Sequence, residues 1–586
     1  MNPDSAVKAG TNRELIALKA GVPADAEFLR IEALPRRAWT KRQARRAARE
    51  MTARLRKPHG QQELWTDQAV ALSEIEWYGG IVGGIKVSGG KTLISLLAPT
   101  LLSHLRNPLL LTPSKSIKSG KVLAAYKEAA EHWNIRSDIQ WCSYELLQRK
   151  EYANYLEKTQ TQLIILDEAH HAGRHNSSRT KRIERYLRKH PDCVIIVLSG
   201  SLIASRVVDD SARLCYWALR DDGPLPRSRQ TQRFWRLALE TPVKAKPGAL
   251  RRFCNDGELT LEGVGRRYRE TPAVCISNGK DLISSALVCE TELVTLKNER
   301  VLEAFANIRA GREPGGDASL DTDGGRTWLT AQTLALGFYY VLDPTPPSDW
   351  LDAMRNWASY CREYIADERN DCDTEAQVIA ELEDSDEVPW PWGEWRDQRY
   401  DHKLTRKAVW LGTERLDAAR EWMRAHKHGI VWTQFRAFGR ELARHAPYYG
   451  AHARDVGGDR GYITDHKRGT PCAASIKVCS EDLNLQHTFH QNLFVAPPAT
   501  GAWLEQAIAR THRFGQKETE VTAHFWLACA ENAANIQIAR LREKQAARMD
   551  GHMRRKLLIA DWIEHNSKIP SNDAWKTKRI AKALIK

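Results

Sequence analysis

The stretch LIILDEAHH, residues 163–171, places two adjacent carboxylates where a run of aliphatic residues ends. A short apolar run that stops at charge is typical of a buried parallel strand, and open α/β sheets hold their ligands at the carboxyl ends of such strands. An aspartate at that edge can hold Mg²⁺, and a glutamate one residue on can orient or deprotonate a water that attacks a γ-phosphate. We therefore expect Asp167 to be a magnesium ligand and both acids to be catalytic, with Glu168 acting on the water.

A glycine-rich stretch, VSGGKT at residues 87–92, lies upstream of these acids and precedes a largely apolar run. A glycine turn that leads into a helix presents backbone N–H groups to phosphates, while the lysine reaches the β and γ oxygens and the threonine hydroxyl ligates Mg²⁺. The stretch departs from the full phosphate-loop pattern, because Ile85 stands where that pattern has glycine. The residues expected to bind ATP here are Ser88, Gly89, Gly90, Lys91 and Thr92, with Lys91 also catalytic and Thr92 also a magnesium ligand.

Basic residues are concentrated near the two ends of the 586-residue chain, whose formal net charge is +15. Residues 36–57 are strongly basic, with Glu50 as the single acid, in an alanine-rich stretch suited to a helix. Such clustering favours a polyanionic partner. No uninterrupted apolar segment approaches the ~20 residues that cross a bilayer, and no signal peptide is evident. We expect a cytoplasmic protein of a bacterium or phage-infected host, without a membrane partner.

Strands that alternate with helical stretches predict an α/β fold with two doubly wound parallel-sheet lobes. The first lobe, residues 61–203, contains Gln68, whose amide can recognise an adenine edge. The other expected strands of this lobe lie at 108–114, 139–144 and 194–201. Residues 204–420 form a largely helical insertion, whose acidic run at 371–387 we interpret as a solvated linker.

The second lobe, residues 421–530, has expected strands at 429–435, 474–479 and 492–496 and ends in QAIARTHRFGQ, residues 506–516. Gln506, Arg510 and Arg513 are spaced i, i+4 and i+7, so a helix that Gly515 ends would place all three on one face. Two arginines aimed at a γ-phosphate would stabilise the charge of the transition state. We count these three residues as catalytic candidates. Basic extensions at residues 1–60 and 531–586 complete the expected organisation.

The order of these motifs resembles helicase superfamily two, and within it the SWI/SNF-like, DEAH-containing branch of DNA translocases, including compact phage-encoded members. The resemblance covers roughly residues 60–210 and 420–525 and is carried by Gln68, 88–92, 112–114, 167–170, 199–201, 434–435, 482–485 and 506–516. It implies two RecA-like lobes that use ATP and Mg²⁺, with Arg510 and Arg513 reaching the nucleotide from the second lobe. It further implies that nucleic-acid phosphates contact Thr112, Ser114, Gln434 and Asn484. Two residues depart from the family pattern, Lys86 where relatives usually have an acid and Ser88 where they have glycine.

The leading hypothesis is an ATP-dependent motor that translocates on double-stranded DNA. One alternative is a helicase that separates strands of DNA or RNA and so also binds single strands. Another is a nucleic-acid-binding protein of the same fold that has lost ATP turnover, which the altered phosphate loop motivates. The sequence leaves open which protein partners, if any, direct the motor.

Overall fold

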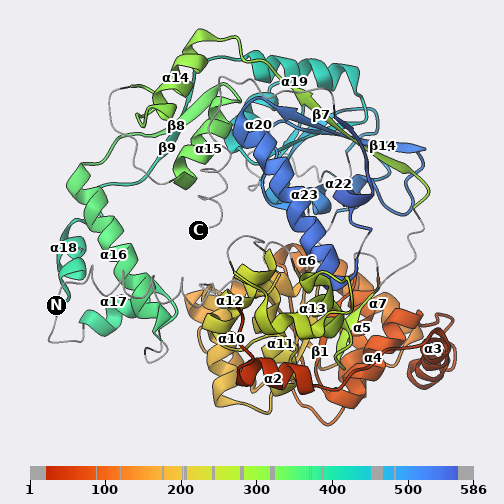
Figure 1. Ribbon diagram of the computed structural model, residues 1–586. Coiled ribbons are helices and arrows are strands. Elements are labelled where there is room, and N and C mark those ends of the chain that lie inside the picture. The colour runs from red at the N-terminus through yellow and green to blue at the C-terminus, as the bar shows by residue number, and fades with distance from the viewer. Residues whose placement is uncertain are drawn as a thin grey trace. The chain divides into compact units, whose positions relative to one another are not determined.

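The computed structural model divides the chain into two compact units (Figure 1). The residues that the structure describes are 21–86, 89–118, 120–173, 177–200, 202–203, 207–240, 245–277, 283–316, 324–367, 370, 372–383, 388–450, 463, 466–480, 483–552 and 554–564. Unit 1 comprises Met1–Lys280, Ala358–Val388 and Lys544–Met553, and unit 2 comprises Asp281–Trp357, Pro389–Glu543 and Arg554–Lys586. Each unit is therefore assembled from three separate stretches of the chain.

Unit 1 contains a six-stranded sheet in the order β3-β2-β4-β5-β1-β6. All of its neighbouring strands run parallel. The strands are β1 (Ile81–Gly84), β2 (Leu109–Thr112), β3 (Gln140–Ser143), β4 (Leu163–Asp167), β5 (Val194–Leu198) and β6 (Val274–Ile276). Because every strand runs in the same direction, the residues that follow the strands meet at one carboxyl edge.

Helices cover both faces of this sheet, and successive strand residues point into two different cores. Leu163 and Ile165 of β4 pack into the core beneath α3, α4, α5 and α7, whereas Ile164 and Leu166 pack with α10, α11 and α13. This alternation follows from the two-residue period of a strand and explains why the strand is apolar throughout. The α-helices that lie wholly in unit 1 are α2 (Ala26–Ala33), α3 (Lys41–Leu55), α4 (Thr66–Tyr78), α5 (Lys91–Leu101), α6 (Ser114–Lys118), α7 (Lys121–His132), α8 (Tyr144–Leu147), α9 (Tyr155–Thr159), α10 (Ser178–Lys189), α11 (Asp209–Leu219), α12 (Arg229–Glu240), α13 (Thr260–Arg269) and α17 (Glu375–Glu383), and 3₁₀ helices span Lys150–Tyr152, Ala169–His171, Arg220–Asp222 and Gly248–Phe253.

Unit 2 contains a seven-stranded sheet in the order β11-β12-β10-β13-β14-β7-β15, again with parallel neighbours. Its strands are β7 (Ala286–Leu293), β10 (Gly429–Thr433), β11 (Tyr448–Tyr449), β12 (Cys472–Ser475), β13 (Gln491–Phe494), β14 (Glu520–Leu527) and β15 (Asp561–Glu564). A separate antiparallel pair joins β8 (Phe338–Leu342) and β9 (Arg406–Trp410).

The helices of unit 2 include two that continue into unit 1, α16 (Ser348–Ala366) and α23 (Ala530–Asp550). The others are α14 (Glu299–Arg309), α15 (Gly324–Leu334), α18 (Trp390–Gln398), α19 (Glu414–Ala425), α20 (Arg436–Leu442), α21 (Ile476–Cys479), α22 (Gly501–Thr511) and α24 (Lys556–Ile559). As in unit 1, adjacent strand residues divide between two cores: Ile430 and Trp432 pack on one face of β10 and Val431 on the other.

The expected α/β class with two parallel sheets is confirmed, but the structure divides the chain at different places. Residues 204–420 do not form one helical insertion, because β6 is the edge strand of the first sheet and β7 lies within the second. Buried and more exposed residues alternate along β7, and Glu290 and Glu292 are among its polar residues. The sequence of β7 therefore lacks the long apolar run that marks β4. The basic extension at 531–586 likewise contains most of α23 and the edge strand β15.

Two local expectations also differ from the structure. The strand expected at 474–479 ends at Ser475, and α21 takes over at once. The acidic run at 371–387, interpreted as a solvated linker, contains α17 in its described part, and its Asp373 is buried in unit 1. Among the described helices, none combines the length and apolarity needed to span a membrane. None of the eleven cysteines, all of which the structure describes, forms a disulfide, and all but Cys254 are buried.

Candidate functional site

The glycine-rich loop ends at Gly90, which caps the N-terminus of α5 in the left-handed conformation with φ 80°. The left-handed backbone favours glycine, and a Cβ at this position would lie 1.9 Å from Nε2 of Gln68, so any other residue would displace the Gln68 amide. Gln68 is buried in the first turn of α4, where its Oε1 accepts a hydrogen bond of 2.8 Å from the Trp65 amide. The structure thus packs Gln68 against the loop. Gly89 and Thr92 are partly exposed in the same loop and helix, and Ser88 lies outside the described residues.

Lys91 opens α5 and forms an ion pair with Glu168, with 2.9 Å between Nζ and Oε1. Its Nζ also donates to the backbone oxygen of Ile85 at 3.4 Å, and the residue is only 8% exposed. Burial by itself would raise the pKa of Glu168, but the charges of Lys91 and His170 lower it to about 2. The Glu168 carboxylate is therefore ionised at neutral pH and holds the lysine within the loop.

Asp167 is the last residue of β4, and two neighbours position it. The Thr112 hydroxyl, at the end of β2, donates to Oδ2 of Asp167 at 3.1 Å. The buried Tyr144 hydroxyl donates to the Asp167 backbone oxygen at 2.8 Å. Burial raises the pKa of Tyr144 well above its usual value, so the phenol remains a donor. Thr112 and Asp167, expected to serve nucleic acid and metal respectively, are thus direct neighbours.

Glu168 adopts a left-handed backbone with φ 50°, which is costly for a residue with a side chain. Several contacts hold it in this conformation. Besides Lys91, the Ser199 hydroxyl donates to Oε2 of Glu168 at 3.4 Å, and His170 Nδ1 lies 3.5 Å from the same oxygen. Ser199 also lies 3.0 Å from His170 Nδ1. Because β5 lies between β1 and β4 in the sheet, Ser199, which follows β5, lies between the glycine-rich loop and the two carboxylates.

Two contributors at this edge, Tyr144 and Ser277, were not among the residues expected from sequence. The Ser277 hydroxyl accepts from the Lys86 amide at 3.4 Å, just after β6 ends. A hydroxyl-bearing residue directly after a short apolar run was the available signal for Ser277, whereas Tyr144 follows Ser143 at the end of β3. Ser114, by contrast, was expected, and its backbone amide donates to Glu145 at 2.9 Å.

Three of the candidates in unit 2, Arg510, Arg513 and Asn484, form a separate group near Ser480 and Leu483. Arg510 is 6% exposed, and its Nε donates to the Ser480 oxygen at 2.7 Å and its Nη1 to the Leu483 oxygen at 3.3 Å. Nη1 of Arg513 donates to Oδ1 of Asn484 at 2.7 Å. Burial and the nearby Arg510 lower the pKa of Arg513. These contacts bring Arg510, Arg513 and Asn484 together.

Of the three residues expected on one helix face, α22 (Gly501–Thr511) carries Gln506 and Arg510 but not Arg513. The helix expected to carry Gln506, Arg510 and Arg513 to Gly515 ends earlier, at Thr511, so Arg513 follows the helix. Tertiary contacts explain the early end, because the Thr511 side chain bonds with Asn492 and His512 Nε2 lies 2.9 Å from the Ser285 oxygen. Gln434 follows β10, and its amide donates to Gln332 at 2.9 Å.

Taken together, the unit 1 edge offers a helix N-terminus, a lysine, two carboxylates and several hydroxyls, a set suited to phosphate and to a hard cation. The chain matches no known protein-family model, and no curated protein matches it. In the described part of the chain, no group of three or more His, Cys, Asp and Glu side chains could hold a metal. A magnesium ion here would accordingly rely on few protein ligands, as Mg²⁺ bound with substrate phosphates usually does.

Proposed function

We propose that this protein is a DNA-dependent ATPase that hydrolyses ATP between two RecA-like lobes, as in helicase superfamily two, and translocates on double-stranded DNA. The observation that carries the proposal is the 2.9 Å contact between Lys91 and Glu168 at the carboxyl edge of the first sheet. A phosphate-binding lysine and a candidate general base meet there from segments far apart in the sequence. Structural ion pairs are also common, so the decisive measurement is ATP turnover itself.

The Lys91–Glu168 pair suggests how binding and chemistry are linked. The α5 N-terminus attracts the phosphates, and Lys91 exchanges its contact with Glu168 for the β and γ oxygens. Departure of the lysine removes the main charge that lowers the Glu168 pKa, so the carboxylate becomes a stronger base as substrate binds. Glu168 can then orient and deprotonate the attacking water, while Ser199 holds the carboxylate in place.

The Thr92 hydroxyl and the Asp167 carboxylate fit a magnesium ion, because both are hard oxygen donors beside the expected phosphates. When bound, Mg²⁺ would neutralise charge on the β and γ oxygens. Thr112 supports this role, since its hydrogen bond to Oδ2 orients the Asp167 carboxylate.

In unit 2, burial favours different roles for the two arginines. Arg510 is buried and donates to the backbone oxygens of Ser480 and Leu483, which favours a role in holding the backbone at these two residues. Arg513 also donates to the Leu483 oxygen, at 3.3 Å, but it is more exposed than Arg510 and contacts the Asn484 side chain, so we assign to it the stabilisation of transition-state charge.

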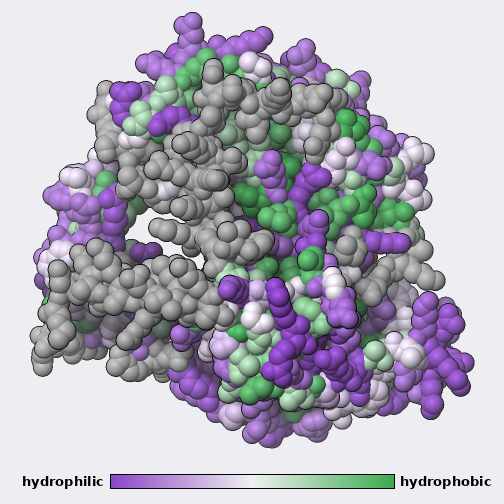
Figure 2. Space-filling model, viewed as in Figure 1, coloured by the Kyte–Doolittle hydropathy of each residue, from purple (hydrophilic) through white to green (hydrophobic). Residues whose placement is uncertain are grey.

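The helix α3 supports nucleic acid as the partner. Its buried side is apolar, with Ala47, Met51 and Leu55, whereas its outer side carries exposed basic residues. The exposed basic residues are Lys41, Arg42, Arg45, Arg46 and Arg49. Figure 2 shows the hydrophilic surface over this helix. A row of cations suits the phosphates of a duplex, because contacts to phosphates do not depend on the base sequence.

ATPase rates with no nucleic acid, single-stranded DNA, duplex DNA and duplex RNA test the proposal directly. We expect the largest stimulation by duplex DNA. Lys91→Ala should lower kcat/KM roughly 100-fold or more, because the lysine no longer stabilises the charge of the transition state. Glu168→Gln should lower kcat about 100-fold or more, because the variant lacks the general base. It should bind ATP at least as tightly as the original protein, because Lys91 no longer has to break an ion pair with Glu168 to reach the phosphates.

Matched controls are Lys127→Ala and Glu131→Gln on α7, both exposed and remote in sequence from the site, which should leave the rates unchanged. Normal ATPase in Lys91→Ala and Glu168→Gln would refute the assignment of the site. Duplex binding without any turnover would instead favour a nucleic-acid-binding protein. Strand displacement measured beside triplex displacement distinguishes a helicase from a translocase.

A further inference from the structure

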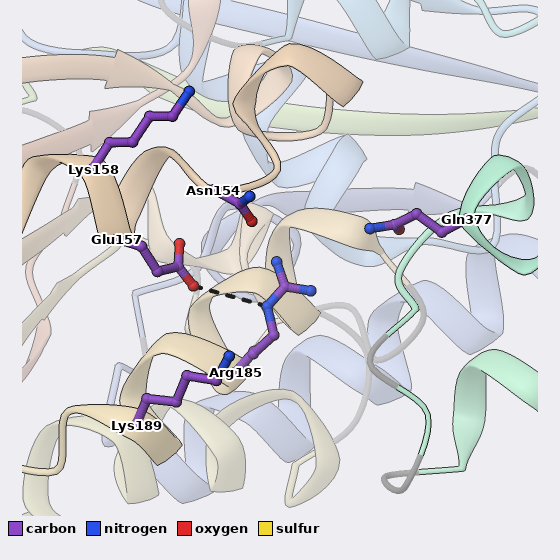
Figure 3. A pocket seen from close by; sticks show the side chains of 6 residues that line it. All are labelled: Asn154, Glu157, Lys158, Arg185, Lys189 and Gln377. Carbon is purple, nitrogen blue, oxygen red and sulfur yellow. Dashed lines mark ion pairs between the residues drawn. The ribbon is translucent and has the colours of Figure 1, made fainter. Parts of the chain in front are cut away.

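Unit 1 contains a pocket of about 640 Å³ that the proposed function does not use (Figure 3). Its lining residues are Asn154, Glu157, Lys158, Arg185, Lys189 and Gln377. They come from α9 and the residue before it, from α10 and from α17. The volume is in the range of small-molecule sites and far exceeds a single phosphate ion.

The pocket lies toward the opposite edge of the sheet from the nucleotide candidates. The helix α9 ends at Thr159, just before β4 begins at Leu163, and α10 ends at Lys189, just before β5 begins at Val194. Residues at these helix ends therefore approach the amino ends of β4 and β5. Lys91 and Asp167 lie at the carboxyl edge, so the pocket is a second site.

Cations dominate the wall of the pocket. The lining contains three cations, Lys158, Arg185 and Lys189, and one carboxylate, Glu157. Its formal charge is therefore +2. Arg185 is 8% exposed and is held by Asp373 Oδ2 at 3.1 Å and the Ala153 oxygen at 3.0 Å. The two lysines are exposed at the ends of their helices, where their charges can adjust to an anion.

Gln377 adds an oriented donor. Its Oε1 accepts from the amides of Asp373 and Thr374 and from the Thr374 hydroxyl, at 3.0, 3.1 and 2.9 Å. The oxygen is thus committed to the turn before α17, and Figure 3 shows the amide nitrogen directed toward Arg185. A donor in this position favours a ligand that presents acceptor oxygens.

A buried ion-pair cluster holds this wall in place. The Asp373 carboxylate, 1% exposed, accepts from Nε and Nη2 of Arg182 at 3.0 and 2.8 Å as well as from Arg185. Arg182 also donates to the oxygens of Leu147 and Arg149, both at 2.6 Å. Such a fully bonded bidentate pair fixes geometry, so Gln377 and Arg185 are preorganised before any ligand arrives.

We propose that this pocket binds a small molecule that carries two or more phosphate groups. Two lysines, an arginine and an amide donor line a pocket that one phosphate would not fill, and phosphate oxygens satisfy donors of this kind. Because the site is separate from Lys91, the proposal does not depend on ATP hydrolysis.

The test uses inorganic tripolyphosphate, titrated by calorimetry into full-length protein at low salt. All variants carry Lys91→Ala, which suppresses binding at the phosphate loop. Adding Lys158→Ala with Lys189→Ala should weaken tripolyphosphate affinity about tenfold or more, since two cations no longer face the anion. Adding Gln377→Glu should weaken it to a similar degree, because one oxygen can keep the bonds of the turn while the other repels the anion.

The matched control adds Lys127→Ala, an exposed lysine on α7 that does not line the pocket, and should bind like the Lys91→Ala parent. Equal affinity in the pocket variants and this control would overturn the proposal. So would pocket variants that lose duplex DNA affinity and keep tripolyphosphate affinity, because the pocket would then be a nucleic-acid contact. Thermal unfolding of each variant identifies any loss of affinity that comes from misfolding.

Discussion

At the scale of single residues, Glu168 is held by several constraints at once. It combines a left-handed backbone, an ion pair with Lys91 and a hydrogen bond from Ser199. Strain of this kind persists only where surrounding contacts over-determine the conformation, and it is concentrated at functional sites. The same contacts that overcome the strain also hold the carboxylate ionised, so stability and proton affinity are linked at this residue.

The low Glu168 pKa predicts a particular pH dependence of stability. The pKa falls from its ordinary value of 4.5 to about 2 on folding, so between these values the unfolded chain binds more protons. The contribution of Glu168 is therefore present above pH 4.5 and disappears as pH falls toward 2. Urea unfolding at pH about 5 and about 3 should show a smaller loss of stability in Glu168→Gln than in the original protein. An equal loss in both proteins would contradict the lowered pKa.

At the scale of elements, α3 and α10 show that similar basic sequences serve different ends. The arginines of α3 face outward, whereas Arg182 and Arg185 of α10 turn inward onto Asp373. The difference lies in the partners: α3 buries small and apolar side chains, while α10 meets a carboxylate from a distant segment. The charge of α3 therefore faces outward along the helix, whereas on α10 Arg182 and Arg185 are paired with a buried carboxylate and Arg188 and Lys189 at its end are exposed.

The outward face of α3 predicts salt-dependent DNA binding. Replacing Arg42, Arg45 and Arg49 together by alanine should weaken duplex affinity at low salt and flatten the plot of log K against log salt. Each phosphate that the protein no longer neutralises changes the slope by about 0.9, equally for unrelated DNA sequences. Because the three side chains are exposed, thermal stability should change little. Fluorescence anisotropy across a salt series gives the slope, and an unchanged slope would mean that this charge is only solvated.

At the scale of the whole molecule, the chain returns to unit 1 twice after leaving it. The segment Ala358–Val388 brings Asp373, and Lys544–Met553 brings the end of α23. There Nη1 of Arg269 donates to the Met549 oxygen at 2.7 Å, and Ala546 and Met549 enter the first core. The integrity of unit 1 therefore depends on residues far along the sequence.

This dependence predicts the behaviour of a fragment. A protein of residues 1–280 contains every strand of the first sheet but lacks both returning segments, so Arg182 and Arg185 lose their buried carboxylate. Unpaired buried charges and an open core are strongly destabilising. The fragment should unfold at a lower urea concentration than unit 1 in the full chain. Hydrogen exchange of the amides in β4 and β5 measures this unfolding in both proteins. Equal protection in both would show that the returning segments contribute little.

Much of unit 1 was predictable from the sequence because the signals are local. The aliphatic run that ends at Asp167 predicted β4, and the glycine turn before Lys91 predicted the start of α5. The rule that parallel strands share a carboxyl edge then brought these residues to the same place, where Lys91 lies 2.9 Å from Glu168. Strand period, glycine conformation and charge at a strand end act within a few residues, so sequence alone determined them.

Other features were decided only by the tertiary structure. Asp373, expected in a solvated linker, is buried against Arg182 across 191 positions, and β7 joins β14 and β15 from distant parts of the chain. The end of α22 at Thr511 depends on its contact with Asn492, not on Gly515. In each case the stabilising partner is remote in sequence, and burial and hydrogen bonding with a remote partner leave no local pattern, because their free energy arises only when folding brings the two segments together.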